Sequence, residues 1–583
     1  MLLSLAKKRS LPRKPALLVS CLLVASLARA DSPGVRVEGG SSELRDNVLA
    51  HLNIDFESCE IPAWREATVM RKARQDTRRA LQAMGHYQPR LELSMEWDND
   101  CWTLVVDMEP GEPVRFRDIH VRISGEAATD PVFRELVEDP PLQTGEPLRH
   151  DRYEQLRRRL VRQADERGYF DSRLTEHRLE IDVLAGTADV HLHLESGPRY
   201  RFGPVSFEQD VLSEELIQRF VRFETGEKYD HRRVLGLRQA LSGSNYFSDV
   251  RIQARHEEAE ELRVPIRVTA TPRLKHSFLA GVGFATDIGP RLRLGYENRR
   301  LNRHGHRYRA EMEASPVRSG IGFNYEIPLA DPARERVNLS ADFRREETDT
   351  SLSKRYRLGA AHMRELDSGW ILTRSLEFER EFFTVSEQRD RTDLVMPGVE
   401  LNRSRSDDPV YPRRGWRLSG KVRGAHDEFA SSVRFGQFRG QGKVILPLLA
   451  GRVLTRVDFG TTSAKEVVEL PSSVRFFAGG DHSVRGYGYQ RLGPEDEDGN
   501  VIGGRHLLVG SLEYDYPILR QWSLAAFVDG GNAFDDYDEY EPAWGVGVGV
   551  RWRSPIGPIR LDVARPDDRR DDFRIHVSMG MDL

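Results

Sequence analysis

The C-terminal half of the chain, from about residue 275 to residue 583, alternates apolar and polar residues in many short segments joined by turns. Successive side chains of a β-strand point to opposite faces, so this alternation gives each segment one apolar and one polar face. The last segment places Phe573, Ile575 and Val577 on one face. One such strand is equally typical of a soluble sandwich, but repetition over this length predicts a membrane-spanning β-barrel.

The connections within this region support sixteen antiparallel strands. Short links, such as residues 330–333, follow even-numbered strands, whereas longer ones follow several odd-numbered strands, at residues 384–392, 463–505 and 531–543. Outer-membrane barrels have short periplasmic turns and longer outer loops. An even number of strands also leaves both ends of the barrel on the side of the N-terminal region.

The composition of the chain argues against two other classes of protein, helical membrane proteins and nucleic-acid-binding proteins. The mean hydropathy of -0.55 and the 31% of charged residues exclude a bundle of membrane helices, which needs repeated apolar runs of about 20 residues. The formal net charge is -4, from 87 basic and 91 acidic residues, so no global field indicates nucleic acid as a partner.

The N-terminus has the pattern of a secretory signal peptide. Basic residues between Lys7 and Lys14 precede an apolar run at residues 16–27 and the small-residue site Ala28-Arg29-Ala30. We expect residues 1–30 to be a signal peptide. A lipoprotein signal ending at Cys21 is the alternative, but few apolar residues precede that cysteine.

Two cysteines, Cys59 and Cys101, remain after the expected signal peptide. An exported chain meets an oxidising compartment, so a disulfide between them is plausible, with two unpaired thiols as the alternative. A disulfide closing a loop of this size would stabilise the first domain by about 3–4 kcal/mol. No metal-ligand spacing surrounds either cysteine.

Residues 34–272 contain an internal repeat of roughly 80 residues. Each unit has a helix that ends in Gly or Asn followed by aromatic residues, at residues 85–87, 168–170 and 245–247. Thr144-Gly145-Glu146 also recurs as Thr225-Gly226-Glu227. The predicted domains are residues 31–111, 112–197 and 198–272, followed by a barrel at residues 273–583.

Each unit is predicted to run strand, helix, helix, strand, strand, with Gly85 capping a helix and the next aromatic entering the core. This α+β order resembles the POTRA (polypeptide-transport-associated) domain. The resemblance implies a sheet edge that recruits extended polypeptides by strand addition. A rigid spacer is the alternative for the second unit, and recruitment is favoured for the first.

The longest loop of the barrel region contains Val484-Arg485-Gly486-Tyr487. This element resembles the hallmark of the outer-membrane assembly-factor superfamily, which includes BamA, TamA and the two-partner secretion transporters. The stretches at residues 408–415, 527–532 and 547–558 are similar to the same superfamily. In its three repeats and its length, the chain resembles the TamA branch of this superfamily.

The resemblance implies that the loop folds back into the barrel lumen. Strand parity places Glu513 and Asp529 on the inner face, and these residues match the superfamily's partners of the loop arginine. The guanidinium of Arg485 would bond carboxylates bidentately, Gly486 would permit a tight turn, and Tyr487 would pack beside it. The alternative is an exposed surface arginine that contributes little.

A second predicted site is the seam between the first and last strands. Gly281 and Gly283 weaken packing in the first strand, and the last strand contains Phe573 and Gly580. We expect weak pairing at this seam, so that it acts as a lateral gate to which an incoming strand adds. Alternatively, each glycine only relieves crowding.

The resemblance implies a factor that assembles autotransporters and other β-barrel proteins in the outer membrane of a Gram-negative bacterium, with the repeats in the periplasm. It also implies a TamB-type partner, anchored in the inner membrane, that contacts the first repeat. Unfolded outer-membrane proteins and the lipid bilayer would be the other partners, and nucleic acid would not be one. Alternatives are a two-partner secretion transporter, a component of lipid transport and a passive solute pore.

We expect no enzymatic activity, no catalytic residue, no metal and no cofactor. The sequence has no Gly-x-Ser-x-Gly, no His-Glu-x-x-His and no phosphate-binding glycine-rich loop. Asp481-His482-Ser483 has the residue types of a catalytic triad, but neighbours in sequence do not converge as a triad requires.

Overall fold

The computed structural model describes residues 33–582 except residues 53–57, 99–100, 350, 387, 555–556, 569–571 and 581. The expected signal peptide lies outside the described residues. The chain divides into two compact units at Arg199 and Tyr200. Each unit is described by itself below.

The first unit contains two α+β domains, and within the described residues both follow the predicted order. The first consists of β1 (Gly34–Glu38), α1 (Ser42–His51), α2 (Ala63–Ala83), β2 (Arg90–Asp98) and β3 (Cys101–Glu109). The second consists of β4 (Arg115–Ser124), η1 (Glu126–Thr129), α3 (Pro131–Glu138), α4 (His150–Glu166), β5 (Arg173–Asp182) and β6 (Thr187–Glu195).

In both domains the last strand lies at the centre of a three-stranded sheet. It pairs in parallel with the first strand and antiparallel with the second, so β1, β2, β4 and β5 are edge strands. Residues of β6 alternate between buried and partly exposed, and Val190 and Leu192 pack with Leu156 of α4 in one core. No helix in the described part of the chain is both long and apolar enough to cross a membrane.

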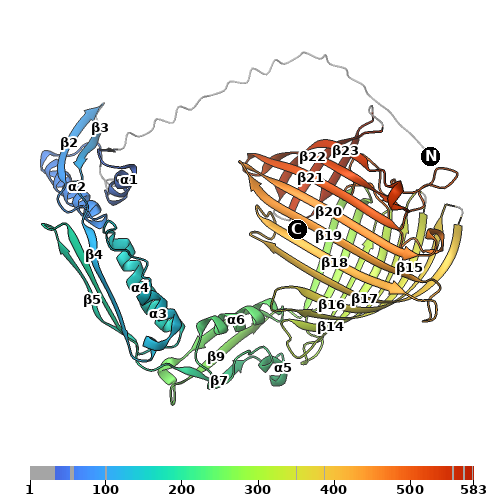
Figure 1. The fold of residues 1–583 in the computed structure, drawn as a ribbon, viewed down its shortest axis with the longest axis horizontal. Helices are drawn as coiled ribbons and strands as arrows, with labels where there is room; N and C mark the ends of the chain where they lie inside the picture. Colours follow the sequence, from blue (N-terminus) through green and yellow to red (C-terminus); the bar gives the residue numbers. More distant parts are fainter. Residues whose placement is uncertain are drawn as a thin grey trace, which may run out of the picture. The chain divides into compact units, whose positions relative to one another are not determined.

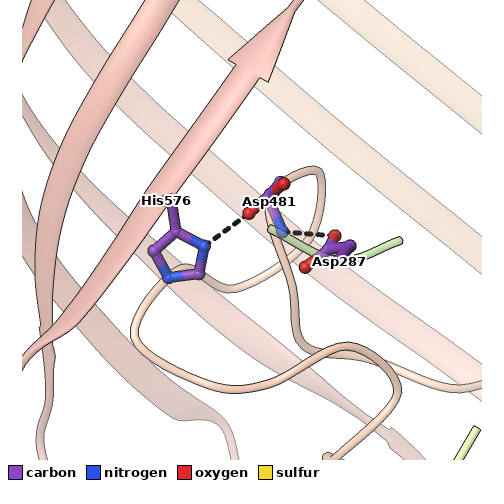
Figure 2. Close-up of side chains that lie close together, drawn as sticks. All are labelled: Asp287, Asp481 and His576. Atoms are coloured by element: carbon purple, nitrogen blue, oxygen red, sulfur yellow. Dashed lines mark hydrogen bonds and ion pairs between the residues drawn. The ribbon is translucent and has the colours of Figure 1, made fainter. Parts of the chain in front are cut away.

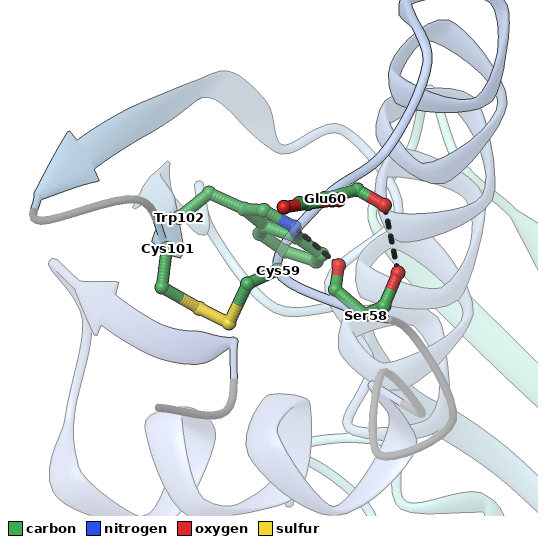
Figure 3. Close-up of a disulfide and its surroundings, with 5 residues drawn as sticks. All are labelled: Ser58, Cys59, Glu60, Cys101 and Trp102. Carbon is green, nitrogen blue, oxygen red and sulfur yellow. Dashed lines mark hydrogen bonds between the residues drawn. A yellow bond between two sulfur atoms is a disulfide. The ribbon is translucent and has the colours of Figure 1, made fainter. Parts of the chain in front are cut away.

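A disulfide joins Cys59, in the connection between α1 and α2, to Cys101 at the start of β3 (Figure 3). The adjoining Trp102 is fully buried, and its indole nitrogen donates a hydrogen bond of 3.0 Å to the Ser58 carbonyl oxygen. The covalent bond and this hydrogen bond together hold the interhelical connection against the sheet.

The sequence predicted that the aromatic residue after Gly85 enters the core of its own domain, but it does not. Tyr87 packs against the core of the second domain, and its hydroxyl lies 2.6 Å from His150 Nε2. The Val114 amide also donates to the Gly85 carbonyl oxygen. The prediction was correct for Tyr169 of the second domain, which is buried in its own core.

The second unit begins with a third domain of the same order, in which β9 pairs with both other strands. Its elements are β7 (Arg201–Glu208), α5 (Glu214–Gln218), α6 (His231–Gly243), β8 (Phe247–Ala254), η2 (His256–Glu258) and β9 (Arg263–Pro272).

The rest of the second unit is a nearly closed antiparallel β-barrel, as predicted, with sixteen strands among the described residues (Figure 1). Every strand pairs with its neighbours in sequence. The strands are β10 (His276–Ala285), β11 (Gly289–Asn298), β12 (Arg307–Ala314), β13 (Arg318–Pro328), β14 (Glu335–Glu347), β15 (Ser351–Glu365), β16 (Ile371–Val385), β17 (Gln388–Ser406), β18 (Gly415–Ala425), β19 (Phe435–Leu448), β20 (Gly451–Ala464), β21 (His506–Leu519), β22 (Trp522–Phe534), β23 (Ala543–Ser554), β24 (Gly557–Pro566) and β25 (Arg574–Met579).

The third domain contacts the hairpin turns at one end of the barrel. The Tyr246 hydroxyl donates a 2.5 Å hydrogen bond to the Gly305 carbonyl oxygen, and Arg222 pairs with Asp331 at 2.9 Å. Counted from β10 as the first strand of the barrel, both turns follow even-numbered strands, β11 and β13. The connections after odd-numbered strands therefore lie at the opposite end, which we call the outer end.

Two outer connections are shorter than predicted. Residues 384–392 were expected to form a long loop, but β16 extends to Val385 and β17 begins at Gln388. Similarly, β22 extends to Phe534, inside the expected loop 531–543, whose remainder contains η4 (Tyr537–Glu539). The first of these segments is strongly charged and does not show the apolar alternation that identifies a membrane strand.

Candidate functional site

The connection between β20 and β21, residues 465–505, lies against the inner wall of the barrel. It contains η3 (Val467–Glu469) and brings Val484 and Tyr487 into an apolar cluster with Leu507 and Val509 of β21. Arg485 is 6% exposed. The loop element identified in the sequence is therefore buried in the protein.

The Arg485 guanidinium binds the two carboxylates that strand parity had placed on the inner face. Its Nε and Nη2 atoms donate to the two oxygens of Asp529 at 2.7 and 2.9 Å, and its Nη1 donates to Glu513 at 2.8 Å. The Arg485 backbone amide also donates to Asp529. This bidentate, charge-assisted arrangement uses the planar geometry that distinguishes arginine from lysine.

The network extends beyond the predicted pair. Asp562 of β24 accepts a 3.1 Å bond from Arg485 Nη1, and Arg551 of β23 bonds both Glu513, at 3.0 Å, and Asp562, at 2.5 Å. The Arg485 guanidinium carbon lies 3.3 Å from the centre of the Phe527 ring. Two arginines thus oppose three carboxylates, all at least nine-tenths buried, so loss of either cation leaves a buried charge uncompensated.

Two glycines allow the loop to approach the wall this closely. Gly486 has φ +101°, a conformation that L side chains rarely adopt. A methyl group at Gly545 of β23 would overlap the Arg485 carbonyl oxygen. Any larger residue at Gly545 would therefore displace the loop.

The same loop contacts the last hairpin of the barrel. The Gly486 amide donates to His576 Nε2 at 2.9 Å, and the Tyr487 hydroxyl donates to Asp567 at 2.7 Å. Tyr487 thus bonds the connection between β24 and β25. Neither contact was predicted.

A polar cluster joins the loop to the first hairpin as well as to the last strand. Figure 2 shows Asp481 between His576 of β25 and Asp287, which lies between β10 and β11. One Asp481 oxygen accepts from His576 Nδ1 at 2.6 Å and from the Thr286 hydroxyl at 2.8 Å, and the Asp481 amide donates to Asp287 at 2.8 Å. We call Thr286, Asp287, Asp481 and His576 the seam clasp.

The seam clasp has the residue types of a cation site, because one ligand atom from each of Asp287, Asp481 and His576 lies within 4.8 Å of the others. However, His576 Nε2 accepts the Gly486 amide, so the imidazole proton resides on Nδ1, facing Asp481. A cation at Nδ1 would have to displace that proton. The geometry therefore favours a hydrogen-bonded junction over a metal site.

Pairing at the seam is sparse. Among the described residues, one backbone hydrogen bond crosses the seam: the amide of Thr286, the residue after β10, donates to the Val577 carbonyl oxygen of β25 at 3.3 Å. The Val577 amide also donates to the Thr286 hydroxyl. After β25 the chain turns inward, where Asp582 pairs with Arg452 at 2.8 Å and also contacts Arg560. In the part of the chain that the structure describes, much of the β10 edge that faces away from β11 therefore has no ladder partner.

The glycines predicted for the lateral gate are not required by close packing. A methyl group at Gly281 or Gly580 would meet no atom within 4 Å, and one at Gly283 would meet only the flexible Arg291 side chain, at 3.8 Å. Phe573, just before β25, is 62% exposed. The proposed weakening of the seam by these residues stays a prediction.

The triad-like residues do not converge. Asp481 bonds His576, not the adjacent His482, and the Ser483 hydroxyl accepts a bond from the Gly479 amide. Parity applied to β24 would have found Asp562, because Ile559, Leu561 and Val563 alternate with it. No periodic pattern points to the bond between Asp481 and His576.

Residues 291–582 match the Omp85 superfamily domain, residues 34–110 match the POTRA domain described as TamA domain 1, and residues 115–197 and 200–272 match the POTRA family described as surface antigen variable number repeat.

Among characterised relatives, the outer membrane protein assembly factor BamA of Nitratidesulfovibrio vulgaris is 25% identical over 401 residues, which are 63% of this chain and 49% of the relative. BamA of Neisseria meningitidis serogroup B is 23% identical over 464 residues, 67% of this chain and 57% of the relative. The chain thus spans about half the length of these relatives.

A crystal structure of BamA from Haemophilus ducreyi lacking POTRA domains 1-3 has a TM-score of 0.65 at 15% identity. The match covers 80% of this chain and 99% of that chain. At this identity the likeness concerns the fold alone.

Proposed function

Because the chain belongs to the Omp85 superfamily, we propose that it is a TamA-type factor that inserts and assembles autotransporters and other β-barrel proteins. It acts in the outer membrane of a Gram-negative bacterium, with its POTRA domains in the periplasm. The match of the first domain to a TamA POTRA domain supports this branch of the superfamily.

The sparse seam is the observation that carries the proposal. A closed barrel offers no edge to an incoming strand, so an insertase has to open one. Each hydrogen bond contributes about 1 kcal/mol net, so separating the few bonds between β10 and β25 costs far less than separating a full ladder. The exposed edge of β10 then templates the first strand of the substrate by strand addition.

The loop sets the resting position of both sides of the gate. Asp481 bonds the first hairpin and the last strand at once, and Arg485 fixes that part of the loop to β21, β22 and β24. Breaking the bonds of His576 with Asp481 and Gly486, together with those between Val577 and Thr286, releases β25 while Arg485 stays anchored. The anchoring of the loop by Arg485, which we call the latch, and the gate are thus separable parts of one mechanism.

The first POTRA domain supplies the contact with a TamB-type partner. Its edge strand β2 exposes backbone to strand addition, and Trp97 near the end of β2 is 51% exposed. Main-chain pairing tolerates many sequences, which suits both a β-rich partner and unfolded substrates.

The proposed factor is not an enzyme and uses no cofactor. Folding of the substrate barrel provides the free energy, because the periplasm contains no ATP. We therefore expect Ser483→Ala to retain full activity. Two-partner secretion and lipid transport stay alternative predictions, and no contact described above favours either.

Depletion of the protein tests the proposal. Outer-membrane proteomics should show loss of autotransporters and a subset of β-barrel proteins, restored by the wild-type chain. A photo-crosslinker at Trp97 should capture an inner-membrane-anchored partner, whereas one at the exposed Leu184 in the second POTRA domain should not. An unchanged outer-membrane proteome with altered lipid composition would instead establish lipid transport.

A further inference from the structure

The outward face of β13–β17 carries an aromatic crevice, on β13–β16, and a basic rim above it, on β14–β17. The crevice has a volume of about 570 Å³, and its lining includes Phe323, Phe343, Tyr356, Phe378 and Phe382. The Phe343 and Tyr356 rings are 4.9 Å apart, and Tyr356 and Phe382 are 6.4 Å apart. Strands β14 to β17 are labelled in Figure 1.

The rim lies at the outer end of the same strands. Cross-strand register places Arg345 opposite Lys354, Lys354 opposite Phe382, and Phe382 opposite Arg391. Arg380 follows in the next row, opposite Tyr356 and Asp393, and Arg389 lies beyond Arg391. We call Arg345, Lys354, Arg380, Arg389 and Arg391 the basic rim.

The positive charge of the rim is only partly compensated. Arg345 pairs with Glu347 at 2.5 Å, and Asp393 pairs with Arg380 at 2.6 Å and with Arg391 at 3.4 Å. Neither Lys354 nor Arg389 belongs to an ion pair within the described residues. Lys354 lies directly opposite Arg345, and like charges directly opposite each other in a sheet repel, so an anion beside Lys354 would stabilise this row.

This charge is local to four strands. The outward positions near the outer ends of the flanking strands are uncharged, including Ala314, Ser319, Gly424, Gly436 and Ser463. A general requirement for solubility would have distributed charge around the barrel. The concentration of cations above the crevice indicates one ligand with acyl chains below and anionic groups above.

We propose that the basic rim and the aromatic crevice bind a phosphorylated glycolipid of the outer leaflet, with its acyl chains in the crevice and its phosphates on the rim. From Arg345 to Arg391 the rim crosses three interstrand spacings, or about 14 Å. That width suits a headgroup with two phosphates, whereas a lipid with one phosphate leaves part of the rim uncompensated. The inference uses the proposed membrane placement but not the assembly activity.

Native mass spectrometry of the full chain in detergent tests this site, with bisphosphorylated hexa-acyl lipid A as the probe. The triple variant Arg345→Gln, Lys354→Gln, Arg391→Gln should bind at least about 10-fold more weakly, because basic clusters dominate the recognition of anionic headgroups. The matched control is Arg364→Gln, Arg374→Gln, Arg403→Gln, which removes three outward cations at the opposite end of the same strands. It should bind like the wild type.

Further arms separate phosphate recognition from general lipid affinity. Lipid A without its phosphates, and phosphatidylglycerol, should both bind more weakly and should not respond to the triple variant. Heat-modifiable gel migration verifies that each variant is folded, and Arg345→Lys, Arg391→Lys should retain binding. Equal binding by the folded triple variant, or rim-dependent binding of phosphatidylglycerol equal to that of lipid A, would overturn the proposal. Because the readout is lipid binding, a failed assembly assay leaves it unaffected.

Discussion

Arg485 is the residue on which the position of the loop most depends. Arg485→Ala removes the ion-pair partner of Asp529 and leaves Glu513 and Asp562 paired with Arg551 alone, at a cost of about 3–5 kcal/mol to the docked loop. We expect complementation of a depletion strain to be lost while the barrel still migrates as a folded species. Arg485→Lys should be intermediate, since an ammonium cannot bond Asp529 bidentately.

The matched control is Arg491→Ala in the same loop, which removes an exposed ion pair with Asp349. Such pairs contribute little, so this variant should be fully active. Limited proteolysis should cut the loop of Arg485→Ala faster than that of Arg491→Ala. A fully active Arg485→Ala protein would disprove the latch.

Asp130 gives the second POTRA domain a pH dependence. Its carboxylate caps α3 and is bonded by Arg167 at 2.7 Å. Burial disfavours the charge, but the hydrogen bonds from Arg167 and the Val132 amide outweigh it and hold the pKa of Asp130 below its ordinary value. Because the folded pKa is the lower one, this stabilisation is present above about pH 4 and is lost as the pH falls through the folded pKa.

Hydrogen exchange of residues 131–166 in the full chain measures this effect. After correction for the intrinsic rate, protection should fall as the pH decreases from 5 to 3. Asp130→Asn should lower protection at pH 7 and flatten the profile. Asp118→Asn, at an exposed carboxylate of the same domain, should follow the wild type. An unchanged profile in Asp130→Asn would refute this role.

Strand periodicity made one part of the site predictable, namely which side chains point inward. Glu513 and Asp529 alternate with Leu512 and Val528, so their inward direction followed from the sequence, and their bonds to Arg485 followed from family resemblance. The path of a long loop has no such periodicity. The contacts of Asp481 and Tyr487 with the last hairpin therefore could not be anticipated.

Strand ends were harder to predict than strands. The β17 residues Arg389, Arg391 and Asp393 continue the ladder beyond the apolar band, where alternation of hydropathy stops but backbone pairing does not. The ends of β14 and β18 are marked more clearly in the sequence, because turns with Asp and Pro or Gly bound these strands closely.

Locking the seam tests whether β10 and β25 separate during the reaction. In Thr286→Cys, Val577→Cys the two sulfurs replace side chains on backbones already joined by a hydrogen bond. Assembly of substrate barrels should stop under oxidising conditions and recover with a reductant, because the locked edge cannot pair with an incoming strand.

The control places a cysteine pair across a complete ladder, with Leu512→Cys, Val528→Cys on the outward face of β21 and β22. Its oxidation should leave activity unchanged. Full activity of the oxidised seam pair, with crosslinking verified by gel migration, would rule out lateral opening.

The division of the chain into two units predicts the effect of domain deletion. Removal of residues 31–199 leaves the third POTRA domain with the barrel, including the Arg307 guanidinium at 4.4 Å from the Tyr246 ring centre and its 2.6 Å bond to the Ser244 carbonyl oxygen. The shortened chain should keep the unfolding temperature of the full-length barrel.

Extending the deletion to residue 272 removes these contacts and should lower the unfolding temperature by about 2–4 °C, as expected for a loss on the order of 1 kcal/mol in a domain of this size. Gel migration after stepwise heating compares the two. Equal destabilisation by both deletions would show that the contacts at Gly305 and Arg307 do not stabilise the barrel.

The enclosed position of Arg485 constrains how this chain completes its own biogenesis. Its partners come from β21 and β22 and from the later β24, while the backbone of Gly545 covers the Arg485 carbonyl oxygen. Because these contacts come from strands on several sides, we expect the last three strands to assemble around a loop that is already in place. Substitutions at Asp562 or Gly545 should then reduce the yield of mature protein before they affect its activity.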